Sequence, residues 1–379
     1  MAGYPAASTL SRSSGATLAV ATADDDAEVR ALLRRSVIPG AVRVAFTREP
    51  DYFLGEGLAG SSDVTIVARR GGVLVAVGRC SVLTLFVNGR PQRVGYLGEL
   101  RMAPGTPASP RLLRDGYAFL AELTDGWGVE RYVTSIADDN DRARRVLAHG
   151  GRFGLPAYRP IARLVTLVAP VTRRASVGAS SPTNAPAIDH APESELTEFL
   201  KSQAKGVQLG LCWDRGQWEA LSQHGLSSDA FSAVRRHGRV VATGAVWDQR
   251  AFRQTVIDGY SSAMRVARPF INAIMTLRSL PPLPAPGERL AMGAVCGATV
   301  TDPNDWTVLW QELNQSASAS GLLWLAIVRD VRDPDLALLR RTLAPREYRT
   351  TLFDVALSGR PHGDADWDGR LFRPEVGLL

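Results

Sequence analysis

The sequence predicts a mixed α/β protein made of two similar domains in tandem. At 379 residues the chain is long for one ordinary domain and fits two of roughly 150 to 200 residues. The first half alternates short apolar segments with amphipathic ones, and one hairpin-like stretch of that half returns in the second. Apolar residues make up 45% of the chain and charged residues 22%, which suits two packed cores rather than a disordered polymer.

The first half contains the elements of an antiparallel sheet with covering helices. Residues 24–36 are predicted to be helical, because acidic residues begin the segment, arginines end it, and Val29, Leu32 and Leu33 share one face. The Asn88-Gly89 pair is typical of a tight turn between strands. In chain order we expect a strand at 17–22, this helix, strands at 64–68, 73–85 and 94–102, a helix at 112–123, a strand at 132–136, a helix at 140–148 and a strand at 162–168.

Part of this pattern is repeated in the second half. The segment RRGGVLVAVG at 69–78 aligns without a gap with RRHGRVVATG at 235–244. Further along, GYLGELRM at 95–102 resembles GYSSAMRV at 259–266, and each is followed by a proline-containing loop and a helix. Two matched hairpins with matched return strands indicate an internal duplication.

The boundary between the copies is predicted at residues 171–187, a stretch rich in Ser, Ala, Pro and Thr with no apolar period. The predicted organisation is a disordered tail over 1–15, a first domain over 16–170, this linker, a second domain over 188–357, and an irregular C-terminal extension over 358–379.

The first domain resembles an acyltransferase of the GNAT superfamily. The resemblance rests on the strand and acidic helix, the RRGG hairpin, the strand YLGELRM, and DDNDRARRVLAHGG, which is similar to the late family motif N-x-x-A-x-x-x-L. The second domain resembles a divergent copy, and WDQRAFRQTVIDGYS at 247–261 is similar to a motif of two-domain bacterial GNAT-like proteins. The resemblance implies two tandem GNAT-like domains and a transferase that moves an acyl group, acetyl from acetyl-CoA, to a small-molecule amine. Acyl-CoA would be a co-substrate, and no cofactor would be permanently bound.

The expected donor loop departs from the family pattern. In the family, a Q/R-x-x-G-x-G/A loop points backbone N–H groups and a helix N-terminus at the pyrophosphate of acyl-CoA. Here the six positions, 107–112, read PASPRL. Neither glycine is present, and each proline removes a donor N–H. In the second copy, residues 264–277 contain no glycine. Neither copy therefore carries the standard loop.

Three interpretations of this defect stay open. Acyl-CoA binds with Arg111 or Arg114 supplying charge in place of amides. Alternatively the donor is aminoacyl-tRNA, as in the Fem peptidyltransferases, which also pair two GNAT-like domains. In the third interpretation catalysis is lost and the chain is a ligand-binding module. The net charge of +6, spread over scattered arginine doublets, leaves a tRNA partner open.

Four further residues of the first domain are assigned to the site by the resemblance. Glu99, on the fourth strand, is the expected general base, and alternation places it on one face with Leu97 and Arg101; the alternative is an ordinary exposed pair with Arg101. Tyr158 is the expected general acid for the leaving thiolate, or else a packing residue. Met102 and Asn140 are assigned to donor binding, although Asn140 also suits the N-cap of the following helix.

The second domain has an unusual density of polar and aromatic residues in a predicted strand region. Burying so many polar groups requires hydrogen-bonded partners, so the stretch predicts either a ligand surface or a polar domain interface. Gln249 and Arg253 belong to this stretch. The residues assigned to substrate binding are Trp247, Asp248, Gln254 and Tyr260, with Arg268 and Asn272 on one face of the following helix.

Several classes of protein are disfavoured. Cys80, Cys212 and Cys296 are far apart, and the five histidines do not cluster, so we expect no metal, no disulfide and a cytoplasmic location. No stretch approaches the roughly 18 uninterrupted apolar residues of a membrane span, so no membrane association is expected. No Ser/His/Asp triad or phosphate-binding loop is visible. The oligomeric state does not follow from the sequence.

Overall fold

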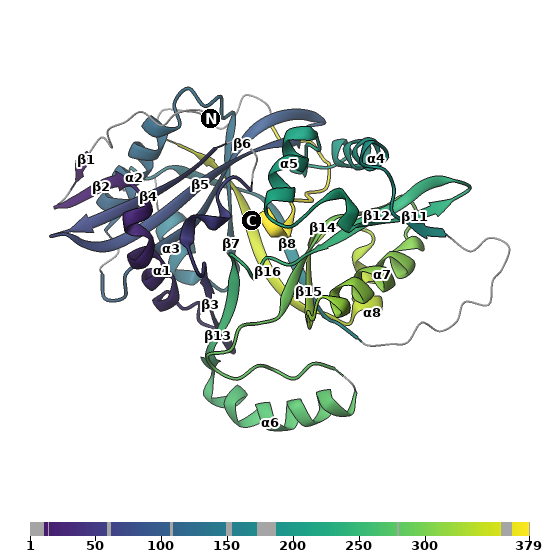
Figure 1. The fold of residues 1–379 in the computed structure, drawn as a ribbon. Helices are drawn as coiled ribbons and strands as arrows, with labels where there is room; N and C mark the ends of the chain where they lie inside the picture. The colour runs from purple at the N-terminus through teal and green to yellow at the C-terminus, as the bar shows by residue number, and fades with distance from the viewer. Residues whose placement is uncertain are drawn as a thin grey trace.

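The strands form one continuous mixed sheet that runs through both halves of the chain (Figure 1). The computed structural model describes residues 11–13, 15–58, 62–106, 109–148, 154–172, 187–278, 280–357 and 366–378. The order across the fourteen-stranded sheet is β1 (Ser11–Ser13), β2 (Ala16–Val20), β4 (Ser62–Arg70), β5 (Val73–Val87), β6 (Arg90–Met102), β7 (Arg131–Ala137), β16 (Arg346–Ala356), β8 (Ala157–Pro170), β15 (Trp324–Asp330), β14 (Met292–Val300), β12 (Arg239–Trp247), β11 (Phe231–Arg236) and β9 (Ala187–Asp189), with β10 (Gly210–Leu211) added to β5.

Helices cover this sheet, and a separate two-stranded ribbon projects from it. The ribbon pairs β3 (Val42–Thr47) of the first half with β13 (Gln254–Tyr260) of the second. The helices are α1 (Asp26–Arg35), α2 (Pro110–Leu123), α3 (Asp141–Ala148), α4 (Glu193–Lys205), α5 (Arg215–Gln223), α6 (Ser262–Leu277), α7 (Asp305–Ala319) and α8 (Leu336–Leu343), with short 3-10 turns η1 (Ala23–Asp25), η2 (Tyr52–Gly55), η4 (Ser228–Ala230) and η5 (Val376–Leu378).

Every element predicted for the first half is present, and its local causes are visible. Val29, Leu32 and Leu33 of α1 are buried against Tyr52 and the inner face of the sheet. The turn between β5 and β6 takes positive φ at Asn88 and Gly89, the conformation that favours these residue types. The strand β3 lies between α1 and β4 and was not predicted.

The predicted duplication is confirmed in its hairpins. Both hairpins turn through two positive-φ residues, Gly71-Gly72 in the first half and His237-Gly238 in the second. Both ladders also carry a register shift at the same aligned position, between residues 68 and 69 and between residues 234 and 235. An irregularity retained at an identical register is difficult to explain without a common origin.

The predicted equivalence of 95–102 with 259–266 is wrong. Residues 254–260 form β13, which pairs with β3 outside the main sheet, and α6 begins at Ser262. The true counterpart of β6 is β14, which pairs with β12 as β6 pairs with β5. β13 and α6 are an insertion between β12 and β14, and the predicted equivalence rested on the shared Gly-Tyr pair at the start of the two segments.

The two halves exchange their last strands. β16, from the end of the second half, lies between β7 and β8, and β8 in turn lies between β15 and β16. β16 and β8 pair antiparallel along most of their length, from Arg346 opposite Val168 to Ala356 opposite Ala157. Each half therefore supplies a strand to the other's sheet, and the halves form one continuous sheet in place of two sheets that merely meet.

The chain ends also bear on the predicted organisation. Most of the predicted linker, residues 173–186, and most of the tail, residues 1–10 and 14, lie outside the described residues. In the predicted C-terminal extension, residues 366–378 are described and lie against the core: Phe372 is buried, and Gln208 exchanges backbone hydrogen bonds with Leu371 and Arg373. No helix in the described part of the chain is both long and apolar enough to cross a membrane.

Candidate active site

A cavity of about 900 Å³ opens where two parallel strands separate. β6 and β7 pair only over three residues, Val94–Tyr96 with Arg131–Val133, and then diverge. The cavity occupies this divergence and is walled on one side by Leu112, Gly116 and Tyr117 of α2. Residues of the second half, including Arg253 and Met292, complete the opposite wall. Both halves therefore contribute to one site.

A β-bulge shapes the wall at the point of divergence. Gly98 pairs with Arg79 and Arg101 pairs with Val77, so that Glu99 and Leu100 together face the single residue Gly78. Glu99 takes a φ of 53°, which is uncommon for a residue other than glycine. The expected alternation of Leu97, Glu99 and Arg101 on one face is therefore wrong, because the extra residue breaks the two-residue period.

The Glu99 carboxylate is held in the cavity wall by two partners. Its Oε1 lies 2.5 Å from the Arg48 guanidinium, and its Oε2 accepts a 2.8 Å hydrogen bond from the Tyr52 hydroxyl. The side chain keeps 21% of its surface exposed, on the cavity side. Burial by itself would raise the pKa of Glu99, but three nearby arginines and the Tyr52 hydroxyl lower that pKa to about 2. Glu99 is therefore a permanent carboxylate near neutral pH.

Two further arginines stand near this carboxylate and line the same cavity. Arg79, only 7% exposed, lies 3.1 Å from Asp63 and donates to the carbonyl of Gly55. Arg253 comes from the second half and donates to the carbonyl of Gly377 over 3.1 Å. Burial, together with the positive charge of Arg48, lowers the pKa of Arg253 to about 10. The sequence placed Arg253 in an unusual polar stretch, but nothing local to that stretch indicated its proximity to Glu99.

Tyr158 lies at the start of β8 and lines the cavity opposite α2. Its hydroxyl is 2.5 Å from that of Tyr117, and the two rings meet edge to face. Burial raises the pKa of both phenols, and the neighbouring Tyr117 raises that of Tyr158 further. Both hydroxyls therefore carry their protons at neutral pH, and one of the pair can donate to a group in the cavity.

Two of the four predicted donor-binding residues, Arg111 and Arg114, lie on the first turns of α2, and neither is among the described residues that line the cavity. Helix α2 begins at Pro110, capped by the Ser109 hydroxyl, which accepts from the backbone N–H of Leu112 over 3.3 Å. Arg111 and Arg114 are exposed on its first turns, and Arg114 lies 2.9 Å from Asp115. Pro107 and Ala108, the first two positions of the predicted loop, lie outside the described residues.

Met102 and Asn140 lie at two other edges of the same region. Met102 is the last residue of β6 and packs, half-buried, against the cluster that contains Leu112. Asn140 lines the cavity, and its Oδ1 accepts a 3.1 Å hydrogen bond from the N–H of Ala143. It is thus the N-cap of α3, one of the two roles that its position predicted.

Three of the predicted substrate residues fasten the ribbon and the sheet. Trp247 is fully buried, and its indole N–H donates to the carbonyl of His224. Gln254, 2% exposed, accepts from the Thr47 hydroxyl and donates to the carbonyl of Glu49, which joins β13 to the first half. Asp248 forms a 2.7 Å ion pair with Arg250. Of these three residues only Gln254 joins the two halves, because Trp247 and Asp248 bond partners within the second half.

The other three predicted substrate residues hold the loop beneath α6. Tyr260 donates to the carbonyl of Pro284 over 2.6 Å, and Arg268 lies over its ring. Arg268 and Asn272 both donate to the carbonyl of Leu283, and Asn272 also accepts from its N–H. Among the described residues that line the cavity, none of the six predicted substrate residues is found.

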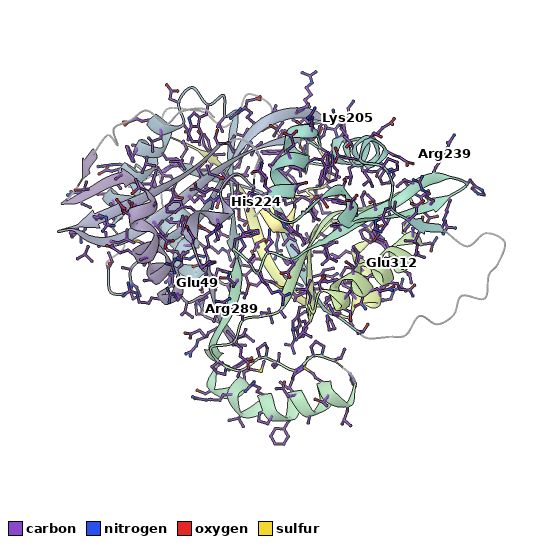
Figure 2. All side chains as sticks on the ribbon, in the orientation of Figure 1. Glu49, Lys205, His224, Arg239, Arg289 and Glu312 are labelled. Carbon is purple, nitrogen blue, oxygen red and sulfur yellow. The ribbon has the colours of Figure 1, made fainter. Side chains whose placement is uncertain are left out.

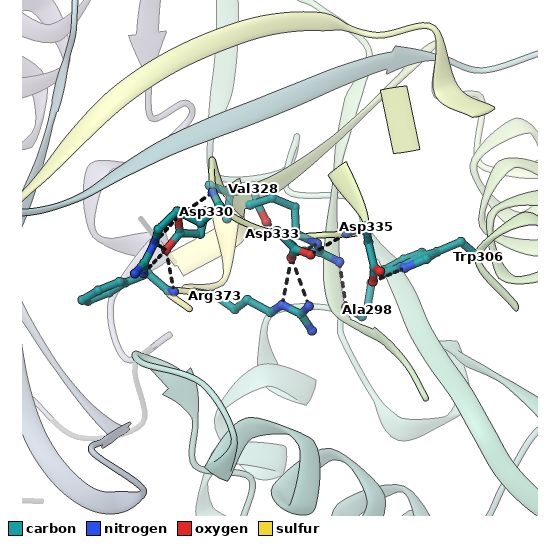
Figure 3. Close-up of polar contacts among 10 residues, drawn as sticks. Ala298, Trp306, Val328, Asp330, Asp333, Asp335 and Arg373 are labelled. Carbon is teal, nitrogen blue, oxygen red and sulfur yellow. Dashed lines mark hydrogen bonds and ion pairs between the residues drawn. The ribbon is translucent and has the colours of Figure 1, made fainter. Parts of the chain in front are cut away.

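The second half contains the equivalent divergence, but the C-terminal segment fills it. β14 and β15 pair parallel over Met292–Ala294 and then separate at a bulge where Gly297 takes a φ of 62°. The Glu375 carboxylate enters this gap and accepts from the Gly297 N–H over 3.1 Å. Two further contacts hold the C-terminal segment. Arg373 donates to Asp333 over 3.0 Å (Figure 3), and the N–H of Phe372 donates to Asp330.

The comparisons with known proteins agree on the fold. No protein-family model matches the sequence, and no curated protein matches it. Yeast (Saccharomyces cerevisiae) N-myristoyltransferase with bound myristoyl-CoA is similar with a TM-score of 0.57 at 10% identity, covering 90% of this chain and 78% of that one. A GCN5-related glucosamine N-acetyltransferase region of a fungal multi-domain β-N-acetylglucosaminidase is similar with a TM-score of 0.54 at 14% identity, covering 93% of this chain and 38% of that longer one. The chain therefore has the GNAT fold, in two tandem copies.

Proposed function

We propose that this protein is an N-acyltransferase that takes its acyl group from acyl-CoA, with one active site per chain, at the divergence of β6 and β7. The observation that carries the proposal is the open divergence of β6 and β7 beside the N-terminus of α2. It forms a cavity of about 900 Å³, whereas the equivalent divergence of β14 and β15 contains Glu375. Similarity to the acyltransferase structures supports the proposal at the level of fold.

The bulge would polarise the acyl carbonyl. A bulge leaves its extra residue without a partner in the ladder, so a backbone N–H near Glu99 and Leu100 can face a ligand in the gap. Such a fixed donor stabilises the negative charge that develops on the carbonyl oxygen during attack by an amine. The positive φ of Glu99 is the local distortion that turns the backbone toward the cavity.

Glu99 would orient the acceptor amine and help its proton to leave. A carboxylate with a pKa of about 2 is too weak a base to hold a proton near pH 7, so the proton would pass through it to water. Its negative charge would still attract the ammonium form of the acceptor and favour the correct approach. The role of Glu99 is thus electrostatic and positional as well as that of a proton acceptor.

Tyr158 would supply the proton to the departing thiolate. Its phenol stays neutral at physiological pH, and the hydrogen bond with Tyr117 fixes its orientation. On the donor side, Arg111 and Arg114 would attract the phosphates at the N-terminus of α2, where the helix dipole also favours negative charge. Met102 and Asn140 would border the pantetheine arm at the end of β6 and the start of α3.

Calorimetry with acetyl-CoA and a longer acyl-CoA tests the proposal, and Gly116 provides a sharp variant. Gly116 lies on α2 in the cavity wall, and a β-carbon added there would meet no atom within 4 Å. We expect one binding equivalent per chain for the unmodified protein. Gly116→Trp should abolish binding by occupying the part of the cavity beside α2, whereas Gly116→Ala, the matched control, should retain it. Two equivalents, or unchanged binding in Gly116→Trp, would contradict a single site at the divergence of β6 and β7.

A further inference from the structure

Helix α6 carries a continuous apolar stripe that faces solvent. Val266, Phe270, Ile274 and Leu277 are 72%, 71%, 53% and 85% exposed, at spacings of four, four and three residues. These spacings place all four side chains on one face of the helix. Large apolar residues exposed in a contiguous row mark an interaction surface more often than scattered ones do. We refer to these four residues as the α6 stripe.

The opposite face of α6 packs on β13 and on the loop that follows the helix. Met275 is 7% exposed and packs in one cluster with Ile257 and Tyr260 of β13. Arg268 and Asn272 bind the carbonyl of Leu283, as described above. Figure 1 shows α6 at the far end of the β3–β13 ribbon, beyond the main body, and Figure 2 shows its outer side chains extending away from the molecule.

The charged residues of the helix itself are all positive. Arg265 and Arg278, near its two ends, are both exposed, and residues 259–287 contain no aspartate or glutamate. An apolar face bordered by arginines matches the chemistry of an anionic lipid surface, in which acyl chains lie beneath a layer of phosphates.

A second copy of the chain fits the stripe less well. A helix of 16 residues is about 24 Å long, and a face about 10 Å wide presents roughly 240 Å², whereas a stable dimer needs about 800 Å² from each partner. Two α6 helices placed face to face would also bring arginines together with no acidic side chain on either helix. Both the area and the charge therefore disfavour self-association through the stripe.

We propose that α6 docks on anionic membrane surfaces, with the α6 stripe among the acyl chains and Arg265 and Arg278 at the level of the phosphates. The sequence expectation of no membrane association rested on the absence of a spanning segment, and an interfacial helix needs none. Val42 and Val44 of β3 pack in the same cluster as Met275 and also line the cavity. Docking would therefore bring the cavity wall close to the lipid surface.

Co-sedimentation of the full chain with vesicles of phosphatidylcholine, alone or mixed with about a third phosphatidylglycerol, tests the proposal. We expect binding to the mixed vesicles and about a tenfold weaker partition for Phe270→Ser/Leu277→Ser, because the apolar insertion is lost. The matched control is Leu54→Ser/Val73→Ser, which removes two exposed apolar residues elsewhere, 48% and 65% exposed, at the same net charge. It should bind as the unmodified protein does.

A second pair of variants separates docking from the general attraction of a basic protein to anionic lipid. Arg265→Gln/Arg278→Gln should weaken partition clearly more than Arg90→Gln/Arg239→Gln, which removes the same charge at exposed sites away from α6. Equal losses from the two arginine pairs, or no loss in Phe270→Ser/Leu277→Ser, would overturn the proposal. The proposal would also be overturned if the unmodified protein did not bind vesicles and sedimentation velocity showed a dimer that Phe270→Ser/Leu277→Ser abolishes.

Discussion

Glu99 on β6 and Gly297 on β14 occupy equivalent positions, each in a bulge opposite an aligned glycine, with φ of 53° and 62°. Gly78 faces the first bulge and Gly244 the second, and these glycines match in the gap-free hairpin alignment. One copy carries a carboxylate at the bulge and an open cavity. The other carries no side chain there and receives a carboxylate, that of Glu375, from the chain's own C-terminal segment.

Gly297→Ala should be strongly destabilising. A β-carbon at Gly297 would lie 2.7 Å from Cε1 of Phe231, in addition to the cost of a positive φ. Gly71→Ala is the matched control, because Gly71 has a φ of +55° and no atom within 4 Å of the added carbon. We expect a loss of about 1 kcal/mol in unfolding free energy for Gly71→Ala and about 2 to 4 kcal/mol for Gly297→Ala, by urea unfolding. Equal losses would show that steric contact at the second bulge is unimportant.

Glu99→Gln should lower turnover by roughly 10²-fold or more while leaving the dissociation constant of acetyl-CoA nearly unchanged. The reason is that Glu99 acts on the acceptor amine and its proton and does not contact the donor's phosphates. Steady-state kinetics with calorimetry of the same variant measures both quantities. Weakened acetyl-CoA binding with normal turnover at saturation would move Glu99 to the donor site.

The lowered pKa of Glu99 also predicts how the stability of Glu99→Gln depends on pH. Because the pKa of Glu99 is about 2 in the folded chain against an ordinary 4.5, its ion pair contributes fully above about pH 4.5. The contribution is lost as the pH falls toward about 2. We expect Glu99→Gln to be less stable by about 3 kcal/mol at pH 7, a difference that shrinks only below about pH 4.5. A difference that stays constant as the pH falls from 7 to about 3 would show that the pKa is not lowered.

Arg111→Ala should weaken acetyl-CoA binding by roughly tenfold at low salt and by less at high salt, because its exposed charge is screened. Prolines at 107 and 110 remove two N–H donors from the loop, so charge at the start of α2 has to contribute more. Arg215→Ala, at an exposed position on α5, controls for net charge. Calorimetry with acetyl-CoA at two ionic strengths compares the two variants. If acetyl-CoA binding does not depend on salt and Arg111→Ala leaves it intact, Arg111 does not bind the donor.

Glu375→Gln should change how stability depends on pH, in the direction opposite to Glu99→Gln. Burial raises the pKa of Glu375, so ionising it costs more in the folded chain than in the unfolded one. The unfolding free energy of the unmodified protein therefore falls as the pH rises from about 4.5 through the raised pKa of Glu375. Relative to the unmodified protein, Glu375→Gln should gain stability over that interval. Urea unfolding at several pH values measures it, and parallel curves would contradict the burial of an ionisable group.

Local patterns in the chain were sufficient to predict most elements of the first half and the repeated hairpin. Amphipathic spacing in α1, the Asn88-Gly89 turn and the RRxG hairpins are short-range features, and short-range sterics and burial decide them. Glu99 and Tyr158 were assigned to the site by a family resemblance, which attaches roles to positions, and both line the cavity in the structure.

Long-range pairing decided the rest. The insertion of β16 between β7 and β8 joins residues about two hundred positions apart, and no local pattern specifies which strand becomes the neighbour. The bulge at Glu99 breaks an alternation that the sequence alone suggests. The partners Arg48, Tyr52 and Arg253, which lower the pKa of Glu99, come together only when the chain folds. Likewise, Glu375 closes the second divergence because the C-terminal segment packs back across the sheet, a placement determined by tertiary contacts rather than by its own residues.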